Sequence, residues 1–411
     1  MARTLWGKVY LKDVYAGRLW EEPGGRCVFA YDADYLDRGG AAIAHTLPPR
    51  AQSYVSERGL HPFFDNLVAE GWLRNAQARA LGVDPANGFA LLLGFGHDLA
   101  GAVSVEDPEP QARTRAEQLD DATLAALRGR ASLSGVQRKL LVVPDGGTYR
   151  PVGPEERSSH IAKLAAGQLG NLLELEVLTT RAVGALLPDD DVVEMALTRL
   201  PAIDEPALIV RRFDRTRTGK PIHFEEFSQL LGKHSGDDKY DGDYEEMGRF
   251  IRRTPSCMPV EADRLLRRIL ACLLVGNTDA HFKNFAMFHR RDGLRLTPAY
   301  DLVAASVYPE YQTIALGVAG TRGIAIGALQ AKHVAGLGAG FGVPDDALMD
   351  GVKQLGKRLP RALEAVAGAD VGPKALRDTL QDRLEKRWRG SFASIGRLLS
   401  KRHGRGAADS G

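Results

Sequence analysis

The chain has 411 residues, more than one hydrophobic core usually supports, so we expect two or more domains. A hydrophobic content of 44% and a charged content of 26% are ordinary for a globular protein, and a net charge of +2 excludes a strong overall attraction to nucleic acid. The sequence has no apolar run long enough to cross a bilayer, no signal peptide, and only three scattered cysteines, Cys27, Cys257 and Cys272. These features predict a cytoplasmic protein without a membrane segment.

The first part of the chain, about 1–105, predicts a small α/β domain. The stretch "LWGKVYLKDVYAGRLW" predicts a β-hairpin with turn residues at Asp13 and Gly17, and "CVFAYDADYL" predicts another strand. Residues 60–82 have helical spacing, and the apolar face consists of Phe64, Leu67, Val68 and Trp72. The glycine-rich "GFGHDLAG" (94–101) leads into "AVSV" and not into a helix, so we predict a turn before a strand there.

The apolar pattern is lost between residues 106 and 120, which we predict to be a linker. Residues 121–222 then predict a strand-rich lobe with the strands "SGVQRKLLVV", "HIAKL", "VVEMALTRL" and "ALIVRRF", interrupted by one helix at about 172–186. Residues 223–400 are mostly helical in pattern, and we expect the tail, 401–411, to be disordered. Strands followed by helices indicate the α+β fold class.

One stretch, "NTDAHFKN" (277–284), carries the strongest chemical signal. Asp279 and Asn284 have the D-x-x-x-x-N spacing of a kinase loop, in which the aspartate is the base and the asparagine binds a metal ion. A predicted hairpin over 285–297 follows and returns the chain to Asp301, where a second oxygen ligand for Mg²⁺ is expected. Either acid alone is more often a helix cap or a turn residue. The ordered set favours phosphoryl transfer.

Two further residues of this loop have open roles. His281 either orients the loop through backbone contacts or is solvated, and we favour a structural role over catalysis. Lys283 either approaches the γ-phosphate of a nucleotide or is solvated.

A nucleotide site requires cations and a phosphate-binding turn earlier in the chain. Lys163 in the strand "HIAKL" is placed like the kinase lysine that pairs with the α- and β-phosphates, and Glu176 on the following helix is a candidate partner for it. The stretch "SLSGVQRKL" (132–140) is either a phosphate loop, with Ser132, Ser134, Gly135 and Lys139, or a plain turn that enters a strand. The backbone of "LIVRRFDR" (208–215) is a candidate adenine contact, whereas Phe213 is more often a core residue than an adenine stack.

The set "SLSGVQRK", "HIAK", "RRFDR", "NTDAHFKN" and "LTPAYDLVAA" resembles the HipA-like serine/threonine kinases, the toxins of bacterial toxin–antitoxin pairs. In the N-terminal part, "FFDNLVAEGWLR" and "GHDLAGAVSV" resemble the small domain that precedes the kinase core in that family. The resemblance therefore covers about residues 5–400. It implies an α+β fold in which a small N-terminal domain precedes a bilobal kinase-like core.

The resemblance also implies roles for individual residues. Asp279 would be the catalytic base, and Asn284 and Asp301 would bind Mg²⁺. The ATP contacts would come from the lysine Lys163, from the backbone around Arg211, Arg212 and Phe213, and from the phosphate loop with Ser134, Gly135, Gln137 and Lys139. The family autophosphorylates a serine of that loop, for which Ser132 and Ser134 are both candidates, and two phosphate charges there would repel ATP.

The resemblance further implies a protein substrate, for some members an aminoacyl-tRNA synthetase, and a HipB-like DNA-binding antitoxin as partner. Contact with DNA would then run only through the antitoxin, because the net charge of this chain is nearly neutral. Two alternatives stay open. One is a small-molecule kinase, which the same loop would serve. The other is a catalytically silent co-repressor bound to the antitoxin.

Overall fold

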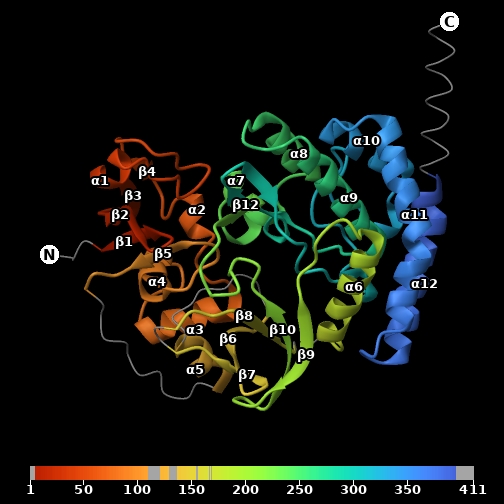
Figure 1. Ribbon diagram of the computed structural model, residues 1–411, viewed down its shortest axis with the longest axis horizontal. Coiled ribbons are helices and arrows are strands. Elements are labelled where there is room, and N and C mark those ends of the chain that lie inside the picture. The colour runs from red at the N-terminus through yellow and green to blue at the C-terminus, as the bar shows by residue number, and fades with distance from the viewer. Residues whose placement is uncertain are drawn as a thin grey trace, which may run out of the picture. The chain divides into compact units, whose positions relative to one another are not determined.

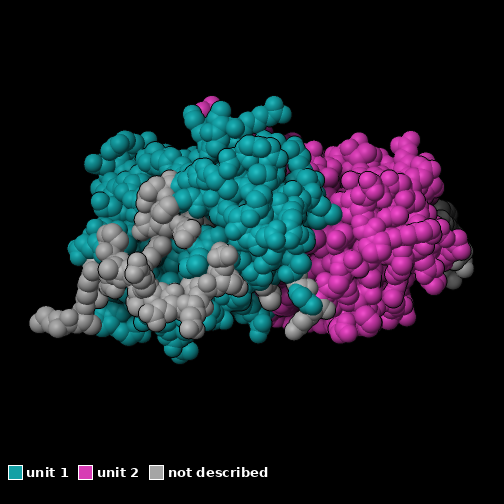
Figure 2. Space-filling view, turned by 90° about the horizontal axis from the view of Figure 1, so that it is seen from below, with its two compact units in different colours: residues 1–167, 194–238 teal, residues 168–193, 239–411 magenta. Residues whose placement is uncertain are grey.

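The computed structural model describes residues 5–109, 121–128, 137–153, 156–165, 167 and 169–394. The chain forms two compact units, which Figure 2 distinguishes by colour: residues 1–167 with 194–238, and residues 168–193 with 239–411. The strands lie mainly in the first unit and the long helices in the second (Figure 1), so the predicted α+β class is confirmed. The predicted domain boundaries stay a prediction, because most of the linker and the whole tail lie outside the described residues.

An antiparallel sheet in the order β4-β3-β2-β1-β5 begins the first unit. Its strands are β1 (Trp6–Leu11), β2 (Val14–Glu22), β3 (Arg26–Tyr31), β4 (Tyr54–Ser56) and β5 (Val103–Glu106). The predicted hairpin is β1–β2, and it turns at Lys12 and Asp13, whose φ angles are 51° and 65°. Positive φ at both turn residues matches the twist of the paired strands. Gly17 is not a turn residue, because it lies inside β2, where an added Cβ would collide with the carbonyl of Ala30.

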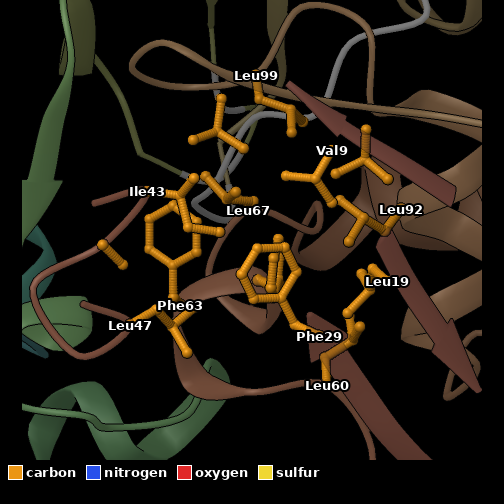
Figure 3. Packing of buried hydrophobic residues seen from close by; sticks show 14 of the residues in the cluster. Val9, Leu19, Phe29, Ile43, Leu47, Leu60, Phe63, Leu67, Leu92 and Leu99 are labelled. Carbon is orange, nitrogen blue, oxygen red and sulfur yellow. The ribbon is translucent and has the colours of Figure 1, made fainter. Parts of the chain in front are cut away.

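Buried side chains of this sheet and of the following helices form one core (Figure 3). Val9, Leu19 and Phe29 from the strands pack in it with Leu67 and Leu92. The helices are α1 (Ala33–Asp37), α2 (Pro62–Asp65), α3 (Gly71–Leu81) and α4 (Gly88–Phe95).

Two predictions for this region were wrong in detail. The strand predicted over residues 27–36 ends at Tyr31, because Asp32 accepts the N–H of Tyr35 and starts α1. Residues 60–82 form two helices, because the chain leaves the helical conformation between α2 and α3, and Gly71 has a φ of 57°. Trp72 therefore lies on a different helix from Phe64.

A second antiparallel sheet, in the order β7-β6-β8-β10-β9, completes the first unit with one short strand and two helices. Its strands are β6 (Lys139–Asp145), β7 (Thr148–Pro151), β8 (His160–Leu164), β9 (Met195–Leu200) and β10 (Glu205–Arg211), and the other elements are α5 (Asp121–Arg128), β11 (Phe224–Glu226) and α7 (Phe227–Leu230). The four strands predicted here are all present. Leu73 of α3 and Ala126 of α5 share a core with Leu140 and Ala162 of the sheet.

The second unit is mostly helical. Its helices are α6 (Leu172–Leu186), α8 (Tyr244–Arg253), α9 (Val260–Val275), α10 (Ala331–Phe341), α11 (Asp345–Ala367) and α12 (Lys374–Arg387), and its strands are β12 (Ala286–Arg290) and β13 (Gly293–Leu296). Short helical turns are η1 (Gly236–Tyr240), η2 (Phe282–Asn284), η3 (Ala305–Val307), η4 (Ile326–Ala328) and η5 (Trp388–Phe392). Helix α6 has the predicted bounds. In the part of the chain that the structure describes, no helix has both the length and the apolar character to cross a membrane.

Candidate active site

The loop that carries Asp279 begins where α9 ends. Gly276 has a left-handed conformation (φ 81°) and donates its N–H to the carbonyl of Cys272. An added Cβ would collide with the guanidinium of Arg387 and the hydroxyl of Ser306. Arg387 donates to that hydroxyl at 2.6 Å and to the carbonyl of Leu274 at 2.9 Å. Both the backbone conformation and the available space therefore require glycine at this position.

Three hydroxyl groups hold the loop in place, one from the loop itself and two from tyrosines outside it. The bonds run from Thr278 to the Tyr311 carbonyl (2.8 Å), from Tyr244 to the Ala280 carbonyl (2.8 Å) and from Tyr300 to the Lys283 carbonyl (2.7 Å). Burial raises the pKa of the Tyr244 phenol well above its usual value, so Tyr244 remains a donor. The backbone of the loop is thus fixed while the side chain of Asp279 is exposed.

His281 and Asn284 shape the next turn of the loop. The Oδ1 atom of Asn284 accepts the N–H of His281 at 3.0 Å, and the Nδ1 atom of His281 accepts the N–H of Lys283 at 3.3 Å. These reciprocal bonds form a capping box around η2. This geometry supports the structural role favoured for His281. Both His281 and Lys283 are buried.

The predicted hairpin is β12–β13, and it returns the chain to Asn284. The Nδ2 atom of Asn284 donates to Oδ2 of Asp301 at 3.0 Å. Asp301 has a φ of 56°, which is uncommon for any residue other than glycine, although aspartate and asparagine tolerate it best. Such a conformation persists only where the surrounding structure imposes it.

The residues on both sides of Asp301 are held by α6 and the segment that follows it. The N–H of Ala299 donates to the carbonyl of Asp191 at 2.7 Å, and its carbonyl accepts the N–H of Val193 at 3.0 Å. On the other side, the N–H of Ala304 donates to the hydroxyl of Thr179 at 3.0 Å. These contacts explain why the unusual backbone conformation is maintained.

Asp279 has a neighbour that sequence reasoning missed. The hydroxyl of Tyr240 donates to Oδ1 of Asp279 at 3.1 Å, and its ring meets the His281 ring edge-on with centroids 4.9 Å apart. Tyr240 stands in the polar stretch "KHSGDDKYDGDYEE", whose composition predicts only a solvated loop. No pattern in that stretch signals a contact with an acid 39 residues later.

The side-chain oxygens of Asn284 and Asp301 suit a hard divalent cation. Asp301 offers carboxylate oxygens, and the amide oxygen of Asn284 has a second lone pair beyond the one that accepts the His281 N–H. A cation held by both side chains would replace their present hydrogen bond. The structure therefore brings the two predicted ligands together and places the predicted base on the same anchored loop.

The first unit carries the residues expected to contact the nucleotide. Lys163 on β8 is buried, and it lies opposite Lys139 on β6. Directly opposed residues of antiparallel strands project from the same face, so two lysines share one face of the sheet. Paired cations of this kind suit a polyphosphate. Glu176 is buried on α6 in the second unit, and its pairing with Lys163 stays a prediction.

Most of the predicted phosphate loop, with Ser132, Ser134 and Gly135, lies outside the described residues, so its roles stay predictions. Gln137 is described. Its Nε2 atom donates to the carbonyl of Leu164 at 2.9 Å, and its own carbonyl accepts the indole N–H of Trp72 at 3.3 Å. Gln137 thus ties the end of this segment to β8, next to Lys163.

Two backbone N–H groups of the segment expected to contact adenine are already bonded within the first unit. The N–H of Arg211 donates to the carbonyl of Glu194 at 2.9 Å, and the N–H of Arg212 donates to the carbonyl of Ser159 at 3.0 Å. Phe213 packs edge-on against Phe224, with centroids 5.0 Å apart. An adenine contact here would use the carbonyl groups, an N–H group other than these two, or the ring of Phe213.

The side chain of Arg212 has a role that the sequence did not reveal. It is buried, and it donates to Asp214 at 2.7 and 2.9 Å, to Asp98 at 3.2 Å and to the Ser158 hydroxyl at 2.8 Å. Arg215 bonds to the same two acids. The Arg212 guanidinium is therefore committed to the interior of the first unit, and this side chain does not remain for a ligand. Asp98 is 114 positions away from Arg212, and no local pattern links them.

Both halves of the chain match known protein-family models. Residues 131–363 match the model of the HipA-like C-terminal domain, and residues 7–106 match that of the HipA N-terminal domain. Two proteins of Sinorhizobium fredii are similar: "Putative kinase Y4dM" is 31% identical over 87% of this chain and 92% of its own length, and "Putative kinase Y4mE" is 33% identical over 72% and 76%. "Serine/threonine-protein kinase toxin HipA" of Shewanella oneidensis is 27% identical over 89% and 90%.

A solved structure agrees with the predicted fold. HipA in the complex of Shewanella oneidensis HipA, HipB and operator DNA matches with a TM-score of 0.74 at 23% identity, over 95% of this chain and 99% of that chain. At this identity the likeness concerns the fold, and it confirms the predicted kinase-like architecture. Because a family model covers more than half of the chain and the Y4dM relative exceeds 30% identity over most of both lengths, the chain belongs to the HipA-like family.

Proposed function

We propose that the chain is an ATP- and Mg²⁺-dependent serine/threonine protein kinase and the toxin of a toxin–antitoxin pair. The observation that carries this proposal is the anchored loop on which Asp279 precedes Asn284, with Asn284 bonded to Asp301 at 3.0 Å. Relatives named as kinases and as a serine/threonine kinase toxin support it.

In this proposal Asp279 is the base that accepts the proton of the acceptor hydroxyl. Asn284 and Asp301 hold Mg²⁺, and Lys163 and Lys139 face the phosphates of ATP. The bound nucleotide and metal supply the phosphoryl group and neutralise its charge. The fixed backbone around the loop keeps the base and the metal ligands in place, which is most of what phosphoryl transfer requires of a protein.

The substrate and the partner are proposed on the family and not on the site. We propose a protein substrate in translation, such as an aminoacyl-tRNA synthetase, and autophosphorylation at Ser132 or Ser134. The solved HipA structure contains HipB and operator DNA, which supports a HipB-like antitoxin as the partner. Because the net charge of this chain is only +2, DNA contact is expected through that antitoxin.

The test compares the wild-type protein with Asp279→Asn in labelled ATP and Mg²⁺, with and without a chelator. We expect label on the peptide that contains Ser132 and Ser134, and on protein in a cell extract, only for the wild type with Mg²⁺. Transfer that survives Asp279→Asn would refute the proposed base. Label on metabolites alone would favour a small-molecule kinase, and ATP binding without any transfer would favour a silent co-repressor.

A further inference from the structure

Tyr240 touches the residue that the proposed function makes the base, so its role rests on that function. The chain enters the second unit between residues 238 and 239, and Tyr240 ends η1 just after this crossing. Its hydroxyl donates to Oδ1 of Asp279 at 3.1 Å. Because 38% of Tyr240 is exposed, burial in a core does not explain where its ring lies.

The segment that follows Tyr240 is fixed against the loop of Asp279. A Cβ added to Gly242 would lie 2.7 Å from the ring of Phe282, so only glycine allows this close approach. Two residues later, the hydroxyl of Tyr244 bonds to the carbonyl of Ala280 at 2.8 Å. Asp243 accepts the N–H of Glu246 at 2.9 Å and thereby starts α8. The backbone beside Tyr240 is therefore held, and its phenol has a defined position.

The hydrogen bond from Tyr240 to Asp279 suits the chemistry of a carboxylate base. A base must present one oxygen to the acceptor hydroxyl in a fixed direction. A phenol on Oδ1 restricts rotation of the carboxylate and so fixes the direction in which it meets the acceptor. A hydrogen bond to the ionised form also favours that form, which extends the pH range in which the base is competent. The edge of the His281 ring limits the movement of Tyr240 itself.

We propose that Tyr240 is a positioning residue for Asp279: its hydroxyl orients the carboxylate. The residue acts through Asp279 and does not contact the reacting atoms. This role goes beyond the loop motif, because Tyr240 lies outside it in sequence.

The test is Tyr240→Phe, which keeps the ring and its contact with His281 and removes only the hydroxyl. We expect kcat to fall about tenfold, since a bond to a charged group is lost. The KM for ATP should not change, and the acid limb of the pH–rate profile should move to higher pH. The matched control is Tyr308→Phe, which loses a hydroxyl bonded to the carbonyl of Gly170 at 2.8 Å in the same unit, and it should keep the wild-type profile.

The outcomes separate the two proposals. Wild-type kinetics and pH profile in Tyr240→Phe, beside an inactive Asp279→Asn, would overturn the role of Tyr240 and leave the kinase intact. A higher kcat/KM for the acceptor would also overturn it, because the phenol would then be blocking the acceptor. A wild-type protein that transfers no phosphate at all would overturn the proposed function and the role of Tyr240 together.

Discussion

Among single residues, Asp301 combines an uncommon backbone conformation with a chemical role. Its φ of 56° is one that asparagine also tolerates, so Asp301→Asn removes the charge without adding backbone strain. We expect the melting temperature to stay close to that of the wild type. Phosphate transfer should fall by at least about 100-fold, because an anionic ligand of the metal is lost.

Initial rates across a Mg²⁺ titration and thermal melts of both proteins provide the measurement. A rate that recovers fully at high Mg²⁺ would limit the role of Asp301 to metal affinity. A near-normal rate at all Mg²⁺ concentrations would contradict the proposed ligand. Asp301→Ala serves as the contrast, because alanine at positive φ should add about 1 kcal/mol of strain and lower the melting temperature as well.

The residues of this site also show which parts of it could be predicted from the sequence. The spacing from Asp279 to Asn284 and the hairpin before Asp301 are local patterns. They could be predicted because loops and hairpins form between residues that are close in sequence. Tyr240 and Asp98 have no such pattern. Each meets its partner only through tertiary structure, at separations of 39 and 114 residues.

Among elements, α9 ends at its cap residue Gly276, and the loop that carries Asp279 starts there. Gly276→Ala would force a side chain into a left-handed backbone and against Arg387 and Ser306. We expect a loss of about 2–4 kcal/mol in the free energy of unfolding, from backbone strain and overpacking together.

Urea denaturation measures this loss. The matched control is Gly327→Ala in η4, where an added Cβ meets nothing within 4 Å, and its effect should stay within about 0.5 kcal/mol. Equal stabilities of the two variants would contradict the argument that Gly276 is required. The transfer activity of Gly276→Ala should also fall, because the loop would start in a different place.

Other elements show why some predictions held and others did not. Helix α6 and four of the five strands of the second sheet follow continuous hydrophobic periodicity, so their positions could be predicted, whereas the short strand β7 was missed. The helical spacing of residues 60–82 concealed a break, because apolar residues of a turn can bury without continuing a helix. Gly71 was the available signal, since glycine readily takes the positive φ found there.

At the scale of the whole molecule, the first unit contains the N-terminal family match and part of the C-terminal match, and a buried ionic cluster joins them. Asp98 belongs to the N-terminal match, whereas Arg212 and Arg215 belong to the C-terminal match. All three side chains are at most 3% exposed. Removing one partner from such a cluster leaves a buried charge uncompensated, which is far more costly than losing a surface ion pair.

This cluster should make stability depend on acid pH. Burial alone would raise the pKa of Asp98, but the charges of Arg212 and Arg215 lower it to about 2, whereas an aspartate in the unfolded chain titrates near ~3.9. A lowered pKa means that the stabilisation is present above about pH 4 and is lost as the pH falls toward 2. The wild type should lose about 2–3 kcal/mol between about pH 5 and pH 1 through Asp98 alone, most of it in this window.

Asp98→Asn isolates this contribution. We expect it to cost about 3–5 kcal/mol at pH 7, because the two arginines lose a charged partner, and to flatten the dependence of stability on pH between 4 and 2. Urea denaturation at several pH values measures both effects. Asp34→Asn is the control, since its carboxylate is 80% exposed beside Arg38, and it should follow the wild-type curve. Parallel curves for wild type and Asp98→Asn would show that the cluster does not carry the acid sensitivity.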